Sequence, residues 1–160
     1  MIRKKNIFLF PWLLFCCLFS VETIADKHLN SIDVENKLGQ KISSNIQILT
    51  DKDELINLDS IFNQGTPTVL VMAYYQCPML CSLVLNGLSK ALSESNLLPG
   101  SDYTALTISI DSNEDSSLSK EKKDNYINNY FDGIASSDFW IFSTATQGNI
   151  NQITKELGFS

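Results

Sequence analysis

Histidine and cysteine are scarce in this chain of 160 residues, and their scarcity limits the metal chemistry that the chain can support. The single histidine is His28, and the four cysteines are Cys16, Cys17, Cys77 and Cys81. A structural zinc site needs about four protein ligands. After residue 25 the chain offers only two thiols and one imidazole far from them in sequence, which argues against zinc.

Basic residues are also in deficit. The chain has 12 Lys and Arg against 18 Asp and Glu, a formal net charge of −6. Because the neutralisation of phosphates by basic residues supplies most nucleic-acid affinity, an acidic chain is a poor nucleic-acid binder. It is a poor match for anionic lipid surfaces too, and acidity alone more often serves solubility.

The first 25 residues have the pattern of an export signal. Arg3-Lys4-Lys5 precedes an apolar run from Ile7 to Phe19, and Thr23-Ile24-Ala25 offers a site for cleavage near Ala25. The apolar run is shorter than the roughly 20 residues that span a bilayer. We therefore expect residues 1–25 to be a signal peptide, with an N-terminal membrane anchor as the alternative. Cleavage would leave Cys77 and Cys81 as the only thiols, in a compartment where disulfides persist.

The rest of the chain alternates apolar extended segments with helical patterns. Strands are predicted at 46–49, 68–74, 103–110 and 140–142, and helices at 78–94, 117–131 and 147–157, while 53–63 is open between helix and loop. The near-continuous apolar run at 68–74 predicts a strand buried on both faces, as in the centre of a parallel sheet. This order favours right-handed parallel crossovers and an α/β sandwich. We expect residues 26–66 to form an N-terminal extension with short strands and residues 67–160 to form the core.

Cys77 and Cys81 lie where the strand at 68–74 ends and the helix at 78–94 begins. The helix dipole should lower the pKa of the nearer thiol, which makes Cys77 the expected thiolate. Residues four apart share a helical face, so both sulfurs should lie on one side. Such a pair can hold one soft metal ion, or close into a disulfide if the first turn is distorted. Two inert buried thiols are the alternative that this position disfavours.

The segment 74–88, with its Cys77-Pro78-Met79-Leu80-Cys81 motif, strongly resembles the Sco/SenC family of copper-binding, thioredoxin-like assembly proteins. Residues 107–111, 140–142 and 157–159 are similar to further segments of that family, and the resemblance covers about 39–159. It implies a thioredoxin-like three-layer α/β/α sandwich that binds copper through the thiolates of Cys77 and Cys81. It also implies a cytochrome c oxidase subunit as partner, and a location in the periplasm or on the outer face of the inner membrane.

The resemblance has one serious gap. The family's third copper ligand is a His that follows a Gly-Phe motif, and this sequence ends one residue after Phe159. We therefore expect a chain truncated relative to its family, which lacks the C-terminal strands and helix and leaves an exposed apolar sheet edge. The alternative is that a second polypeptide or a dimer partner supplies the missing strands.

The residue pattern leaves three functions open. The first is a copper chaperone for cytochrome c oxidase assembly. The second is a thiol-disulfide oxidoreductase, in which Cys77 attacks a partner disulfide and Cys81 resolves the mixed disulfide. The third is an inactive truncated product. A metal carrier fits better than an enzyme.

Several other residues are weaker site candidates. Met79 could be a soft third ligand for Cu(I), although a packing role is favoured. Asp111 ends a core strand and could orient a site residue, or serve only as a cap or a solvated group. Of Tyr74 and Tyr75, which alternate on the strand, one should pack in the core and the other at the site mouth. His28 is far from the thiols in sequence, and the charged run 120–124 is expected to be a solvated helix face.

Overall fold

The computed structural model describes residues 34–43, 45–77, 79–132 and 136–159. Its elements, in chain order, are β1 (Gln47–Thr50), β2 (Leu55–Asn57), α3 (Asp59–Phe62), β3 (Thr68–Ala73), α4 (Leu80–Ser93), β4 (Thr104–Ser109), α5 (Ser116–Tyr130), β5 (Trp140–Thr144) and α6 (Gln147–Glu156). Within these ranges, no helix combines the length and the apolar character that crossing a membrane requires. The expected signal peptide or anchor, residues 1–25, lies outside the described residues.

All five strands form one sheet in the order β2-β1-β5-β4-β3. The strands β3, β4 and β5 run parallel, and Val71, Thr107 and Phe142 align across them. The strand β1 pairs antiparallel with β5, and β2 pairs antiparallel with β1. Parallel neighbours need a crossover connection, which α4 and α5 supply. The α/β order predicted from the sequence is confirmed.

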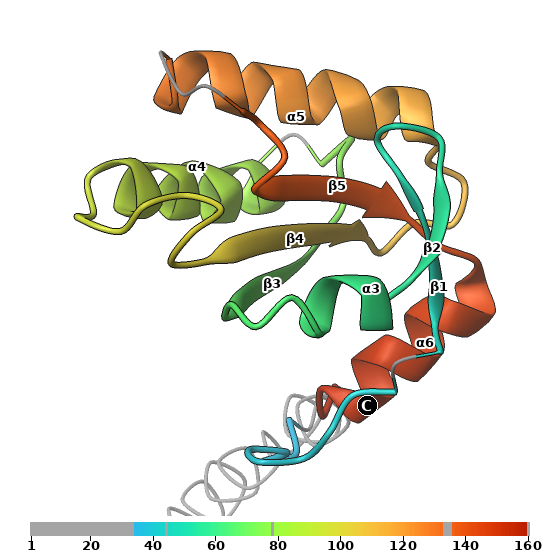
Figure 1. The fold of residues 1–160 in the computed structure, drawn as a ribbon. Coiled ribbons are helices and arrows are strands. Elements are labelled where there is room, and N and C mark those ends of the chain that lie inside the picture. Colours follow the sequence, from blue (N-terminus) through green and yellow to red (C-terminus); the bar gives the residue numbers. More distant parts are fainter. Residues whose placement is uncertain (1–33, 44, 78, 133–135, 160) are drawn as a thin grey trace, which may run out of the picture.

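Helices cover both faces of the sheet (Figure 1). One buried cluster lies under α4 and α5 and consists of Ala73, Tyr75, Leu85, Tyr103, Ala105, Tyr126, Phe131, Phe139, Trp140 and Phe142. The other lies under α3 and α6 and consists of Ile46, Ile48, Leu58, Ile61, Leu106, Ile108, Ala145, Ile150 and Ile153. Successive strand residues alternate between the two clusters, because side chains along a strand point to opposite faces. The expected three-layer α/β/α sandwich is therefore confirmed.

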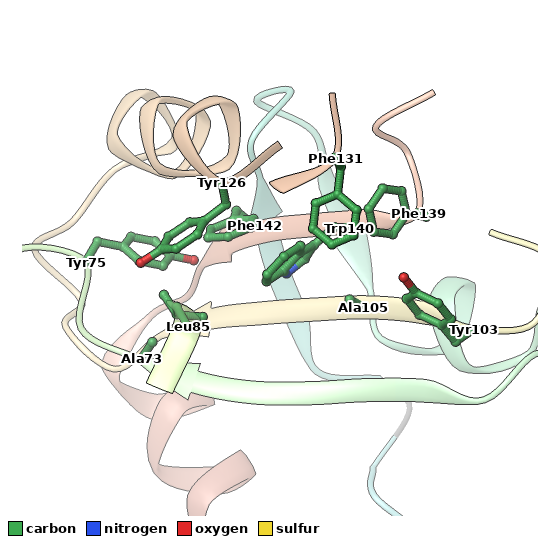
Figure 2. Packing of buried hydrophobic residues seen from close by; sticks show 10 residues of the cluster. All are labelled: Ala73, Tyr75, Leu85, Tyr103, Ala105, Tyr126, Phe131, Phe139, Trp140 and Phe142. Carbon is green, nitrogen blue, oxygen red and sulfur yellow. The ribbon is translucent and has the colours of Figure 1, made fainter. Parts of the chain in front are cut away.

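Aromatic rings dominate the first cluster, and Figure 2 shows them gathered between α5 and the sheet. The rings of Trp140 and Phe142 lie 5.2 Å apart, and Tyr126 stacks on Phe142 at 6.0 Å. The Trp140 indole donates a hydrogen bond to Thr107 Oγ1 at 2.9 Å, which satisfies its buried N–H. This packing fixes α5 on β5 and β4, and so fixes the loop that follows β4.

The prediction of a central position for the segment at 68–74 is wrong. Among the described residues β3 pairs with β4 alone, and its residues from Thr68 to Met72 are only half-buried. The fully buried central strand is β4. The sequence misleads here because β3 contributes to both clusters, through Val71 on one face and Leu70 and Met72 on the other. Burial of both faces makes a strand apolar throughout, whether it has one neighbour or two.

The segment 53–63 is neither a single helix nor a loop. A tight turn at Asp53, whose φ is +62°, returns the chain into the short strand β2, and the one-turn helix α3 follows. The hydrogen bond from Thr50 N–H to Glu54 O, at 2.9 Å, closes this turn. Short elements of this kind depend on pairing with β1, which no local pattern reveals.

The expectation that residues 120–124 form a solvated face holds only in part. Lys120 and Asp124 form an exposed ion pair. Lys123 instead points inward and pairs with Asp51 at 2.8 Å, and both side chains are nearly fully buried. Asp51 also accepts the backbone N–H of Phe142 at 3.1 Å. A buried Lys is tolerated because this carboxylate compensates its charge, and the partner is 72 residues away in sequence.

Candidate functional site

Cys77 and Cys81 lie together at the carboxyl end of β3 and the start of α4. A hydrogen bond from Cys77 N–H to Tyr74 O, at 3.3 Å, closes a turn that places Cys77 ahead of the helix. Because α4 begins at Leu80, Cys81 lies in its first turn and Cys77 lies outside it. The prediction that both thiols share a helical face is therefore wrong. The turn, rather than helical spacing, sets the position of Cys77.

The N-terminus of α4 has no side-chain cap, and the Cys77 thiol lies just ahead of it in sequence. The N-cap residue, Met79, accepts no hydrogen bond through its side chain. The backbone N–H groups at this helix start act on the Cys77 sulfur instead, that of Cys81 most strongly and those of Met79 and Leu80 less so. These donors stabilise the thiolate and hold the pKa of Cys77 below its ordinary value. This direction agrees with the expectation from the helix dipole.

Cys81 has the opposite character. It is half-buried against the aromatic cluster, and this burial raises the pKa of its thiol. The Cys77 thiol raises the pKa of Cys81 further, while the Tyr74 N–H, which donates to Cys81 Sγ at 3.3 Å, acts the other way. Both thiols are half-buried, and the site therefore combines a thiol with a lowered pKa, Cys77, with a thiol whose pKa is raised, Cys81.

Glu114 is a site-supporting residue that the sequence analysis missed. It is only 7% exposed, and its two carboxylate oxygens accept the backbone N–H groups of Tyr75 (3.0 Å) and Gln76 (2.8 Å). The hydroxyl of Ser109 donates to the same carboxylate at 2.5 Å. A signal existed, since a polar run follows β4 and the carboxyl ends of parallel strands meet at one sheet edge. Asp111, which follows the end of β4, is the more obvious candidate in that run, and nothing local marks Glu114.

The two tyrosines before the motif divide their roles as expected. Tyr75 is buried, and its hydroxyl donates to Ser143 O at 2.7 Å and accepts Ser143 N–H at 3.0 Å. Tyr74 is half-exposed and touches the site through the N–H that it donates to Cys81. Tyr75 thus ties the cysteine loop to β5 across the sheet.

Among the described residues, the remaining candidates from the sequence make no side-chain hydrogen bond to either thiol. The Asp111 carboxylate accepts the backbone and side-chain N–H groups of Asn113, at 2.9 and 2.8 Å, so it shapes a local turn. Met79 is exposed and lies between the two cysteines in sequence. His28 and Pro78 lie outside the described residues.

Metal-binding groups are sparse around the pair. Within 34–43, 45–77, 79–132 and 136–159, no group of three or more His, Cys, Asp or Glu side chains is arranged to hold a metal ion. Cys77 and Cys81 are both free thiols. Two sulfurs with no third His, Cys, Asp or Glu ligand in the described part of the chain suit a soft ion of low coordination number, and they suit thiol-disulfide exchange equally well.

Neither a scan against models of protein families nor a search of curated proteins finds a match to this chain. Solved structures do match. A putative electron transfer protein from Aquifex aeolicus is 19% identical with a TM-score of 0.64, covering 75% of this chain and 66% of its own. Copper-bound ScoI from Arabidopsis thaliana is 19% identical with a TM-score of 0.54, covering 73% and 66%.

A third match is BsSco, described as a member of the Sco family of cytochrome c oxidase assembly proteins in which a disulfide switch was identified. It is 19% identical with a TM-score of 0.52, covering 77% of this chain and 66% of its own. This chain thus spans just under two thirds of the length of these three structures. At such identities the likeness establishes the architecture: the chain has the thioredoxin-like α/β fold of the Sco structures.

Proposed function

We propose that this protein is a copper chaperone that binds one Cu(I) through the thiolates of Cys77 and Cys81. The observation that carries the proposal is the pair of free thiols at the uncapped start of α4, on a fold shared with copper-bound ScoI. Soft sulfur ligands favour Cu(I) over hard ions, and each thiol releases its proton on binding.

The residues present fit this cargo. Cys77 is half-buried and its pKa is lowered, so it supplies the first thiolate. Cys81 has a raised pKa and ionises as the ion displaces its proton. Met79 offers a thioether close by in sequence. Cu(II), which prefers tetragonal nitrogen and oxygen ligands, finds no such set among the described residues.

The receiving partner that we propose is a cytochrome c oxidase subunit, since BsSco belongs to a family of assembly proteins for that enzyme. We place the exchange in the periplasm or at the outer face of the inner membrane, with residues 1–25 as the export signal or anchor.

Competition with a coloured Cu(I) chelator tests the proposal. Wild-type protein should bind one Cu(I), and Cys77→Ser and Cys81→Ser should each lose binding almost completely, because a single thiolate is a poor site. Met79→Leu keeps the volume without the thioether sulfur and should retain the stoichiometry, which would show that Met79 is not a required ligand. One Cu(I) bound by either Cys→Ser variant would refute the two-sulfur site.

A second function, thiol-disulfide exchange, is favoured by the opposite pKa shifts of the two thiols. The Cys77 thiolate would attack a partner disulfide and expel one partner sulfur as a thiolate. Cys81 would then attack the Cys77 sulfur and expel the second partner thiolate, so that two electrons pass from the pair to the partner. Cys81→Ser should trap mixed disulfides in this case, and the absence of trapped species would favour copper carriage.

A further inference from the structure

Glu114 holds the two residues that immediately precede Cys77. Its carboxylate accepts the Tyr75 and Gln76 N–H groups, and Ser109 donates to it as a third partner. Backbone N–H bonds to a carboxylate are charge-assisted and stronger than neutral ones. Three donors converging on one buried carboxylate form a clamp between the β4–α5 loop and the cysteine loop.

This clamp acts where β-sheet pairing has ended. The last residue of β3 in the ladder is Ala73, which aligns with Ser109 of β4. Beyond it the chain must turn toward α4, and the N–H groups of residues 75 and 76 have no strand partner within the described residues. Without Glu114 these two donors would compete for water at a partly buried edge, and the turn would have several accessible geometries.

We propose that Glu114 is a positioning residue for the Cys77–Cys81 pair, because its carboxylate fixes the backbone that sets where the Cys77 sulfur stands relative to Cys81. The proposal rests on the proposed function in that the pair is the working site, but it holds for copper binding and for thiol exchange alike. In copper binding both sulfurs contact one ion, and in thiol exchange one sulfur attacks the other. In either case a more mobile Cys77 lowers the effective concentration of one sulfur at the other.

Glu114→Gln is the informative change, because glutamine has nearly the same shape but only one acceptor oxygen. Its amide N–H would then face a backbone N–H, so one of the two loop donors loses its partner. Asp51→Asn is the matched control. Asp51 is about as buried as Glu114, at 9% against 7% exposure, but its hydrogen bonds go to Lys123 and Phe142 rather than to the cysteine loop.

The first measurement is independent of copper. An aromatic disulfide reagent, 5,5′-dithiobis(2-nitrobenzoate), forms a mixed disulfide with Cys77 and releases one thiolate. Cys81 then attacks the Cys77 sulfur, forms the Cys77–Cys81 disulfide and expels the second thiolate, so the two cysteines lose two electrons to the reagent. The rate at which the second thiolate is released is measured at high pH, where Cys81 is fully ionised and the rate no longer changes with pH. This plateau rate reports how well the two sulfurs are positioned for closure of the disulfide.

We expect Glu114→Gln to slow this closure about tenfold and to weaken Cu(I) affinity about tenfold, a change of about 1.4 kcal/mol in binding free energy. Amide hydrogen exchange at residues 75 and 76 should accelerate as well. For Asp51→Asn, the rate of disulfide closure and the Cu(I) affinity should stay within about twofold of wild type. This should hold even if Asp51→Asn lowers the melting temperature more than Glu114→Gln does. If Glu114→Gln does not fold, Ser109→Ala removes one of the three donors and should slow closure about threefold.

Closure of Glu114→Gln within twofold of wild type would overturn the positioning role, as would equal slowing in Asp51→Asn. If wild-type protein binds no Cu(I) while the closure rates still separate the two variants, copper carriage is wrong and the role of Glu114 stands. If Cu(I) binds normally in every variant and closure does not change, copper carriage stands and the role of Glu114 is wrong.

Discussion

Lys123→Met should be among the most destabilising single substitutions outside the cysteine site. The Lys123 ammonium lies 2.8 Å from Asp51, and the two side chains are 5% and 6% exposed. Methionine fills a similar volume, so the change removes the positive charge and leaves the packing of α5 nearly intact. The Asp51 carboxylate would keep only its hydrogen bond from the Phe142 N–H.

The expected loss of unfolding free energy in Lys123→Met follows from the Asp51 charge that remains buried. Removing one partner of a buried ion pair leaves an uncompensated charge and costs about 3–5 kcal/mol. Asp51 and Lys123 also line a polar surface cavity of about 600 Å³, through which water can approach. We therefore expect the lower end, about 3 kcal/mol. Small domains have a total stability of only about 5–15 kcal/mol, so the loss would be a large part of it.

Urea denaturation of wild type, Lys123→Met, Asp51→Asn and the double variant tests this reasoning. A true charge pair gives a coupling energy, so the double variant should lose clearly less stability than the sum of the two single losses. Lys120→Met is the matched control, because Lys120 forms an exposed ion pair on the same helix and should cost about 1 kcal/mol or less. A loss below about 1 kcal/mol for Lys123→Met, or strict additivity in the double variant, would refute the account.

The two thiols and Gly158 can each be tested directly. Alkylation of Cys77 by iodoacetamide should reach half its maximal rate below pH of about 8.5, because the lowered pKa moves its thiolate population to lower pH. In Cys77→Ser the remaining thiol, Cys81, should titrate above that value, and a profile at or below it would contradict the effect of burial. Gly158→Ala should destabilise the protein in a thermal melt, since φ is +93° and a Cβ there would clash with the backbone oxygen of Glu35. Gly39→Ala, with φ of +79° and open space around it, is its control and should cost less.

The element types were predictable because local signals agreed with the tertiary structure. The segments that became β3, β4 and β5 are apolar and β-branched, and the helices that became α4, α5 and α6 follow turn signals. Asp115 and Thr146 cap α5 and α6 through the N–H groups of Leu118 and Asn149. Where capping residues and apolar periodicity coincide, the sequence alone is sufficient.

The failures have one physical origin, which is dependence on residues far away in sequence. The position of β3 at an edge of the sheet that the described residues form depends on how many strands lie beside it. The burial of Lys123 depends on Asp51, and the importance of Glu114 depends on hydrogen bonds to residues 38 and 39 positions earlier. Nothing in the local pattern distinguishes Glu114 from the acidic residues beside it, since Asp111 and Asp115 belong to the same polar run.

The cysteine pair could be located from the sequence, but the way it is held could not. Helical spacing suggested that α4 itself orients both sulfurs. In the structure only Cys81 belongs to the helix, and Cys77 depends on a turn that Tyr75 ties to β5 and Glu114 ties to the β4–α5 loop. The site is thus supported from β5 and from the loop after β4, the neighbour of β3, as well as from β3 itself. Among the described residues β3 pairs with β4 alone, so the side-chain contacts of Tyr75 and Glu114 are needed to hold the two sulfurs close together. Variants that break these contacts should therefore impair the reactions of the thiol pair before they unfold the domain.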